Sequence, residues 1–282
     1  MQFKRVGAWA PKVLVLTAAA AMAIPSVMAQ KATDLNQGPP KYLFLNNVVL
    51  KPGHSSEFAK LENEEIQSLR SANIMGNYFG MWSITGNSSR MIFFGGFGSF
   101  ADLQKRHEEI ANNATVSAVL SKNNAAEGLI SVSHHSSIYE YQKDLSLNAP
   151  MSLEKMRFAD ITLFIVRGGQ EGAFEHLVKV YLKAYASVPG ASFVTFQKQY
   201  GEGSGTTYMV MTPLESLAGV DAEEASGKTF TKQAGADLLA VLRAQGPSII
   251  KSAESDLFAF GPKISYVPDK WLTDSPDYWG KK

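Results

Sequence analysis

The sequence contains no cysteine. A chain without cysteine has no disulfide, no thiolate nucleophile and no thiolate metal ligand, so its fold must depend on a hydrophobic core. The near balance of 27 basic and 26 acidic residues excludes the strongly basic surface that is typical of nucleic-acid-binding proteins. Because 45% of the residues are apolar, the composition indicates a globular protein, and we predict no nucleic-acid partner.

Motifs of metal and nucleophile chemistry are also missing. There is no HExxH, no EF-hand loop and no GxSxG nucleophile elbow. The glycine-rich run 95–98 lacks the Lys-Ser/Thr pair of a phosphate-binding loop, so we interpret it as a turn or bulge. No histidine stands in a recognised metal-binding spacing, and we therefore predict no metal site.

Only the first 29 residues contain a long hydrophobic run. Basic residues precede the run VLVLTAAAAMAIPSVMA, which closes on small or short side chains before Gln30. This pattern predicts a secretory signal peptide over 1–29, cleaved after Ala29. The alternative is a membrane anchor, but the run is short for a span and contains Pro25. Because residues 1–29 have three basic residues and no acid, cleavage changes the net charge from +1 to −2. We expect a periplasmic or secreted protein with no membrane contact after cleavage.

Two short stretches of the chain echo each other. SSIYEYQKDLSLNAP begins at Ser136, and ESDLFAFGPKISYVP begins at Glu254; they match at a shift of 119 residues. Two further landmarks repeat at nearly the same shift: Lys51-Pro52-Gly53 matches Arg167-Gly168-Gly169, and Ser99-Phe100-Ala101 matches Ser216-Leu217-Ala218. The similar shifts indicate an internal duplication with few insertions.

Each copy has the pattern of a β-α-β-β-α-β unit. Strands are predicted by short apolar or alternating runs at 42–50, 77–85, 90–96 and 131–141, and at 158–166, 192–200, 206–212 and 255–260. Helices are predicted between the first and second strands and between the third and fourth strands of each copy. The first helix of the second copy has a clear apolar stripe: Phe174, Leu177, Val178, Tyr181, Leu182 and Tyr185.

The pattern predicts an α+β fold made of two tandem ferredoxin-like repeats. A polar leader over 30–40 precedes repeat 1 at 41–147, and repeat 2 covers 157–266. The strand sequences MIFFGGF and TYMVM are apolar at successive positions, so both faces of each sheet require burial. Helices can cover one face only. We therefore predict that the two repeats pack sheet to sheet as an intramolecular α+β barrel.

The order of these elements, together with the Lys51-Pro52-Gly53 and Arg167-Gly168-Gly169 turns, resembles the dimeric α+β barrel superfamily. That group includes antibiotic-biosynthesis monooxygenase-like proteins, NIPSNAP-like proteins, chlorite dismutases and dye-decolourising peroxidases. The resemblance covers about residues 41–266. It implies that one chain forms the barrel that single-repeat members form by dimerising. It supports a fold more than an activity, because no catalytic motif is among the matches.

Cofactor-independent monooxygenases of this superfamily hold their substrates with a few polar or aromatic side chains, and the chain offers several. The resemblance suggests these ligand-binding candidates: Asn46, Asn47, Tyr78 and Trp82 in repeat 1, with Thr162, Lys198 and Tyr200 in repeat 2. Asn46 and Asn47 interrupt an apolar strand, and a buried amide without a partner costs about 1–3 kcal/mol. We expect at least one of the two to face inward and to bind backbone, water or ligand.

Three histidines complete the list of candidates. His134 and His135 are adjacent on a predicted strand, so they point to opposite faces and only one can face a given pocket. His107 lies on a predicted helix beside its apolar stripe. The haem-binding families of the superfamily use a proximal histidine with a distal arginine, and no such motif is found here. We predict no cofactor and keep haem as an alternative.

The tail 267–282 is rich in aromatic residues and proline, so we expect it to wrap the protein body without regular structure, or to close a pocket as a lid. For the whole chain we predict an exported soluble protein, a monomer or homodimer, that binds a small molecule. The alternatives are a cofactor-independent monooxygenase-like or haem-binding enzyme, and a structural or oligomerisation module.

Overall fold

The computed structural model describes residues 38–74, 76–150 and 152–280. The predicted signal peptide and most of the predicted leader lie outside the described residues. Within the described ranges, no helix is both long enough and apolar enough to cross a membrane.

The order of elements repeats as the sequence predicts. The first half consists of β1 (Tyr42–Leu50), α1 (Ser55–Ser71), β2 (Tyr78–Ser83), β3 (Arg90–Phe97), α2 (Phe100–Ala111), α3 (Ala114–Ile130) and β4 (Ser131–Tyr141). The second half consists of β5 (Phe158–Val166), α4 (Glu171–Tyr185), β6 (Val194–Gly201), β7 (Thr206–Leu214), α5 (Ala218–Ile249) and β8 (Ile250–Phe260). Both halves are therefore β-α-β-β-α-β units, with the second helix of the first half divided into α2 and α3.

The first strand of each half ends in the same kind of turn. Gly53 and Gly169 have φ angles of +87° and +78°, in the left-handed region that glycine reaches without steric cost. This requirement explains why the two turns share a glycine at the third position of their motifs.

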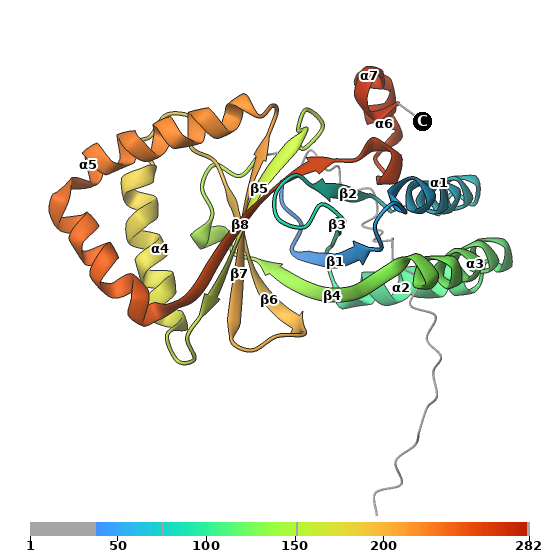
Figure 1. Ribbon diagram of the computed structural model, residues 1–282, viewed down its shortest axis with the longest axis horizontal. Helices are drawn as coiled ribbons and strands as arrows, with labels where there is room; N and C mark the ends of the chain where they lie inside the picture. The colour runs from blue at the N-terminus through green and yellow to red at the C-terminus, as the bar shows by residue number, and fades with distance from the viewer. Residues whose placement is uncertain (1–37, 75, 151, 281–282) are drawn as a thin grey trace, which may run out of the picture.

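The strands form one closed antiparallel barrel in the order β1-β3-β2-β8-β5-β7-β6-β4 (Figure 1). Each half contributes a four-stranded sheet, and the two sheets join edge to edge at β2–β8 and β4–β6. Met81 pairs with Phe260 at one junction and Tyr141 with Phe196 at the other. The predicted α+β barrel built within one chain is confirmed.

Helices cover the outside of the barrel on two opposite sides. Figure 1 shows α1, α2 and α3 against the sheet of repeat 1, and α4 and α5 against the sheet of repeat 2. The repeat 1 layer is solidly packed by apolar side chains from both elements, such as Phe58, Leu69 and Leu120 on Val48 and Phe93. The repeat 2 layer is packed less completely, because α5 bends at Gly235, whose φ of +77° is not helical.

The C-terminal tail closes one end of the barrel. The expectation that it has no regular structure is wrong, since α6 (Asp269–Asp274) and α7 (Pro276–Trp279) are short helices. Pro268 precedes the first helix and Pro276 begins the second, positions that proline tolerates because no helical N–H is needed there. Trp271 and Trp279 are buried in the same core as the inward side chains of the barrel.

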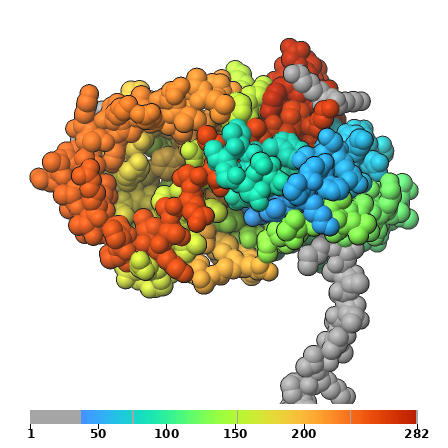
Figure 2. Space-filling model, viewed as in Figure 1, coloured from blue at the N-terminus to red at the C-terminus, as the bar shows by residue number. Residues whose placement is uncertain are grey.

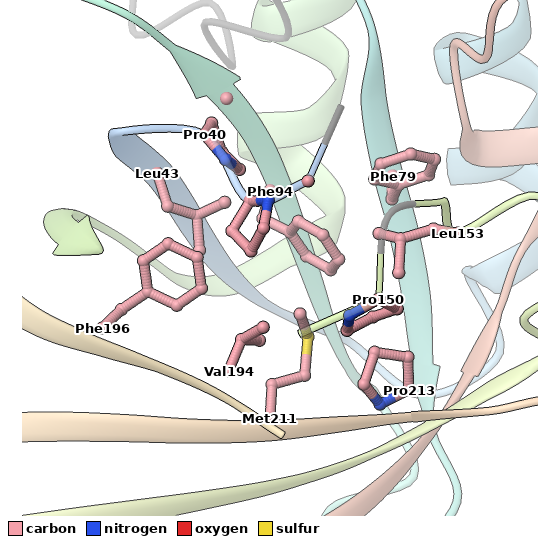
Figure 3. A pocket seen from close by; sticks show the side chains of 13 residues that line it. Pro40, Leu43, Phe79, Phe94, Pro150, Leu153, Val194, Phe196, Met211 and Pro213 are labelled. Atoms are coloured by element: carbon pink, nitrogen blue, oxygen red, sulfur yellow. The ribbon is translucent and has the colours of Figure 1, made fainter. Parts of the chain in front are cut away.

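Prolines and aromatic residues complete this closed end. Figure 3 shows Pro40, Pro150 and Pro213 facing Phe79 and Phe94. The gap between them measures about 40 Å³, too small for an organic ligand. The barrel is thus a cup, filled by side chains at the end where the tail lies.

Candidate ligand-binding site

A large cavity lies between the helices of repeat 2 and the outer face of its sheet. This helix-side cavity measures about 630 Å³ and is lined by β5, β7, α4 and α5. In Figure 2 the molecule is hollowed inside the arch of α5, which is drawn in orange. A volume of this size fits the range that protein pockets use for small molecules.

The helix-side cavity exists because α5 rests on α4 rather than on the sheet. Phe230 of α5 packs on Tyr181 and Tyr185 of α4, with ring centroids 4.5 and 4.8 Å apart. Phe174 of α4 packs on Phe164 of β5 at 5.8 Å. The predicted apolar stripe of α4 therefore packs against both α5 and β5, and it also lines the cavity.

Two carboxyl groups stand in this otherwise apolar cavity. Asp160 of β5 is paired in register with Thr212 of β7, and Glu223 reaches the same cavity from α5. Burial raises the pKa of Asp160, a hydrogen bond from Thr162 partly opposes this, and Asp256 raises it further. Burial also raises the pKa of Glu223, with Thr212 opposing and Asp160 adding to the shift. The two carboxyls thus share one polar patch.

No basic side chain is among the described residues that line the helix-side cavity. Its polar groups are the two carboxyls, hydroxyls such as those of Thr162 and Thr212, and backbone. The carboxyls accept hydrogen bonds and, when ionised, repel anions, while the hydroxyls can both donate and accept. The arrangement suits a flat, mostly apolar molecule that carries hydrogen-bond donors.

A second cavity opens inside the barrel, at the end away from the tail. This barrel-mouth cavity measures about 510 Å³. Its walls combine apolar side chains from several strands, Leu45, Ile92, Ile161, Leu163 and Met209, with charged groups. Arg90 forms an ion pair with Asp256 at 2.7 Å, and Nδ1 of His135 lies 2.9 Å from a Glu202 carboxylate oxygen.

Three of the sequence-predicted residues meet at the barrel-mouth cavity. Asn47, His135 and Lys198 come from β1, β4 and β6 and all line it. Asn47 accepts a hydrogen bond from Arg90 Nε at 3.1 Å. As expected, one asparagine of the pair faces inward, and His135 faces the cavity while His134 lies on the opposite side of β4.

The other ligand-binding candidates do not line this cavity. Asn46, Tyr78 and Trp82 lie on the helix side of their strands, because side chains alternate along a strand. Tyr78 donates to Glu62 at 3.0 Å in a buried polar cluster beneath α1 and α3.

His107 and Tyr200 are exposed. His107 lies on the outer surface of α2, and Tyr200 is 61% exposed with its ring against Phe100. Burial lowers the pKa of His134, and the neighbouring His135 lowers it further. Across the described ranges, no three His, Asp or Glu side chains are grouped so that they could hold a metal ion.

The prediction from sequence missed Asp160, Glu223 and Tyr139. Asp160 had a detectable signal, because it is the one acid in the apolar strand FADITLFIV. Glu223 had none, since its role depends on how far α5 stands from the sheet. Tyr139 was noted only as part of the repeat, and its inward direction follows from the register of β4 against β1.

The fold resembles several solved structures. An anthrone oxidase-like protein aligns with a TM-score of 0.50 and 16% identity, over 78% of this chain and 92% of the other. A chlorite dismutase from Candidatus Nitrospira defluvii gives a TM-score of 0.42, 8% identity, and coverage of 82% and 94%. A NIPSNAP family protein from Agrobacterium tumefaciens gives a TM-score of 0.30 and 22% identity, over 37% of this chain and 89% of the other.

The similarity to the anthrone oxidase-like protein and the closed barrel of this chain support the ferredoxin-like α+β barrel fold that the sequence had suggested. No family model matches the chain, and no curated protein matches it.

Proposed function

We propose that this protein binds a small, largely aromatic molecule with hydrogen-bond donors in the helix-side cavity. The observation that carries the proposal is the pair Asp160 and Glu223, placed in an apolar cavity of about 630 Å³ with no basic residue among its described lining. A structural core would fill such a space, as the repeat 1 layer does. Burial raises the pKa of both carboxyls, and each has one threonine partner, so acceptor positions remain for a ligand.

The ligand chemistry follows from the walls. Aromatic rings of α4 and β5 offer faces for stacking, while the carboxyl patch accepts hydrogen bonds from hydroxyl or amino groups. An anionic ligand would meet two acids and no base. A neutral polyphenol or an aromatic amine fits these conditions.

Haem does not fit the helix-side cavity. None of the five histidines lines it, and haem propionates would face Asp160 and Glu223 without a basic partner. Haem binding therefore gains no support from the donor set of this cavity.

The first test is a titration with Nile red, a neutral dye that fluoresces in apolar sites, followed by displacement with 1,8-dihydroxyanthraquinone. We expect Val178→Trp to fill the cavity and to weaken dye binding at least tenfold. Lys179→Trp adds the same ring one residue along, on the exposed face of α4, and should leave binding unchanged. Equal binding by both variants would place the dye elsewhere and contradict the proposal.

The same preparation tests export. The chain is expressed with its first 29 residues and purified from the periplasmic fraction, where we propose that it resides. The mass of the intact chain should correspond to a start at Gln30. Recovery of the uncleaved chain in the membrane fraction would instead support the anchor.

Oxygenation of the bound molecule is a second candidate function. It is favoured by the two buried carboxyls, since a carboxylate with a raised pKa is a stronger base toward a phenol or an acidic C–H group. The resemblance to an anthrone oxidase-like protein suggests the substrate class. The proton would pass to the carboxylate, dioxygen would oxidise the CH2 group to a carbonyl group, and the second oxygen atom would leave as water.

Oxygen consumption with 1,8-dihydroxyanthrone separates binding from catalysis. We expect wild-type protein to raise the rate above the buffer rate, and Asp160→Asn to lower that increase at least tenfold while the dye still binds. A rate equal to buffer for wild-type protein that binds the dye would leave binding as the function and exclude oxygenation of this substrate.

A further inference from the structure

The inner wall of the barrel-mouth cavity holds two hydrogen-bond donors side by side. Tyr139 of β4 and Lys198 of β6 are register partners across the junction of the two sheets. Residues in such pairs have neighbouring side chains on one face of the sheet. Both line the cavity, so the phenol and the ammonium group face the same space.

Neither donor is fully satisfied by the protein. Tyr139 is only 5% exposed, and across the described residues its hydroxyl forms no hydrogen bond. Lys198 Nζ donates once, to the carbonyl oxygen of Glu202 at 2.7 Å, and an ammonium group has three donors. No described carboxylate lies within ion-pair distance of Lys198. A buried phenol and an ammonium group with two unused donors in one cavity can therefore bind an acceptor from outside.

Two other polar contacts of the cavity join charged or titratable side chains. Arg90 is bonded to Asp256, and His135 to Glu202. Glu254 also lines the cavity, from β8, and is exposed. Lys198 is therefore the cation that remains free to bind an anion.

We propose that the barrel-mouth cavity is a second binding site, for a monocarboxylate with an apolar body, whose carboxylate is held by Lys198 and Tyr139. The apolar body packs on the aliphatic walls formed by residues such as Leu45, Ile161 and Leu163. A carboxylate accepts hydrogen bonds from both donors at once. This ligand differs from that of the helix-side cavity, where acids would repel it.

The test is calorimetric titration of the mature full chain with decanoate, with decanol as the neutral analogue. We expect one decanoate per chain, bound at least tenfold more tightly than decanol. Lys198→Met and Tyr139→Phe should each weaken decanoate at least tenfold, since each removes a hydrogen bond to a charged group. Lys251→Met, an exposed position on the same barrel, is the matched control and should change nothing.

Two results would overturn the proposal: equal affinities for decanoate and decanol, or unchanged decanoate affinity in Lys198→Met. The variant Val178→Trp separates the two cavities. It should leave decanoate affinity unchanged, and a loss would place the acid in the helix-side cavity.

A measurement on wild-type protein avoids dependence on the folding of any variant. Burial lowers the pKa of Lys198 in the free protein. A bound carboxylate favours the ammonium form, so decanoate should raise this pKa. NMR titration of lysines labelled with ¹³C at Cε should show one resonance whose midpoint moves up with decanoate, and no moving midpoint would count against the site.

Discussion

Replacing Trp271 with alanine is expected to lower the free energy of unfolding by about 3–5 kcal/mol, the range for losing a fully buried tryptophan. Trp271 is 0% exposed and stacks on Phe79 with ring centroids 5.6 Å apart. It also contacts Trp279, whose indole donates to the Glu154 carbonyl at 2.7 Å. The tail is therefore part of the barrel core, and the alanine leaves a cavity at its closed end.

Thermal unfolding measures this effect. For a chain of this size, the loss corresponds to a melting temperature lower by about 10 °C. Thr273→Ala in the same short helix is the control, because Thr273 is exposed and its change should move the melting temperature little. If Trp271→Ala had the same melting temperature as the wild-type protein, the tail would not be part of the core.

The architecture could be predicted because it depends on local patterns that occur twice. The alternation of apolar and polar residues and the turn glycines are visible within short stretches of the sequence. The nearly constant shift between matching stretches then shows that the same pattern occurs twice. β8 was predicted at 255–260 but begins at Ile250. The missed part contains Ser252 and Glu254, which line the barrel-mouth cavity, so the apolar alternation that marks a strand is absent there.

The sites were predicted less completely, because they depend on distances between elements. Strand alternation was enough to separate His134 from His135. It could not show that β6 pairs with β4, which brings Lys198 beside Tyr139. Nor could it show that α5 bends at Gly235 and leaves the cavity that Asp160 and Glu223 share.

Repeat 1 gives a contrasting case, in which polar groups are buried without a cavity. Glu62 is 0% exposed; one of its oxygens accepts from Tyr78, and the other has no partner in the described structure. Glu127 is 4% exposed, also with one oxygen unpartnered. Burial raises the pKa of Glu62 to about 8, and burial together with Glu62 raises that of Glu127 to about 9.

These carboxyls should make the protein less stable as the pH rises. In the unfolded chain both ionise near pH 4.5, the usual value for glutamate, whereas in the folded protein both stay protonated up to about pH 8 or 9. Between these limits the folded state binds more protons, so stability falls with rising pH. The stability is fully present below pH 4.5 and is lost through the folded pKa values. Each carboxyl contributes a slope of up to about 1.4 kcal/mol per pH unit.

Glu127→Gln should remove one of the two contributions, because glutamine resembles the protonated acid and cannot ionise. Urea unfolding at pH 5, 6, 7 and 8 should give nearly equal free energies for wild type and variant at pH 5. The variant should then gain progressively and be more stable by a few kcal/mol at pH 8. Glu64→Gln, on the exposed face of α1, should follow the wild-type curve. Parallel curves for wild type and Glu127→Gln would mean that Glu127 ionises in the folded protein as it does in water. In that case the interior beneath α1 and α3 would have to contain water or a cation that compensates the charge.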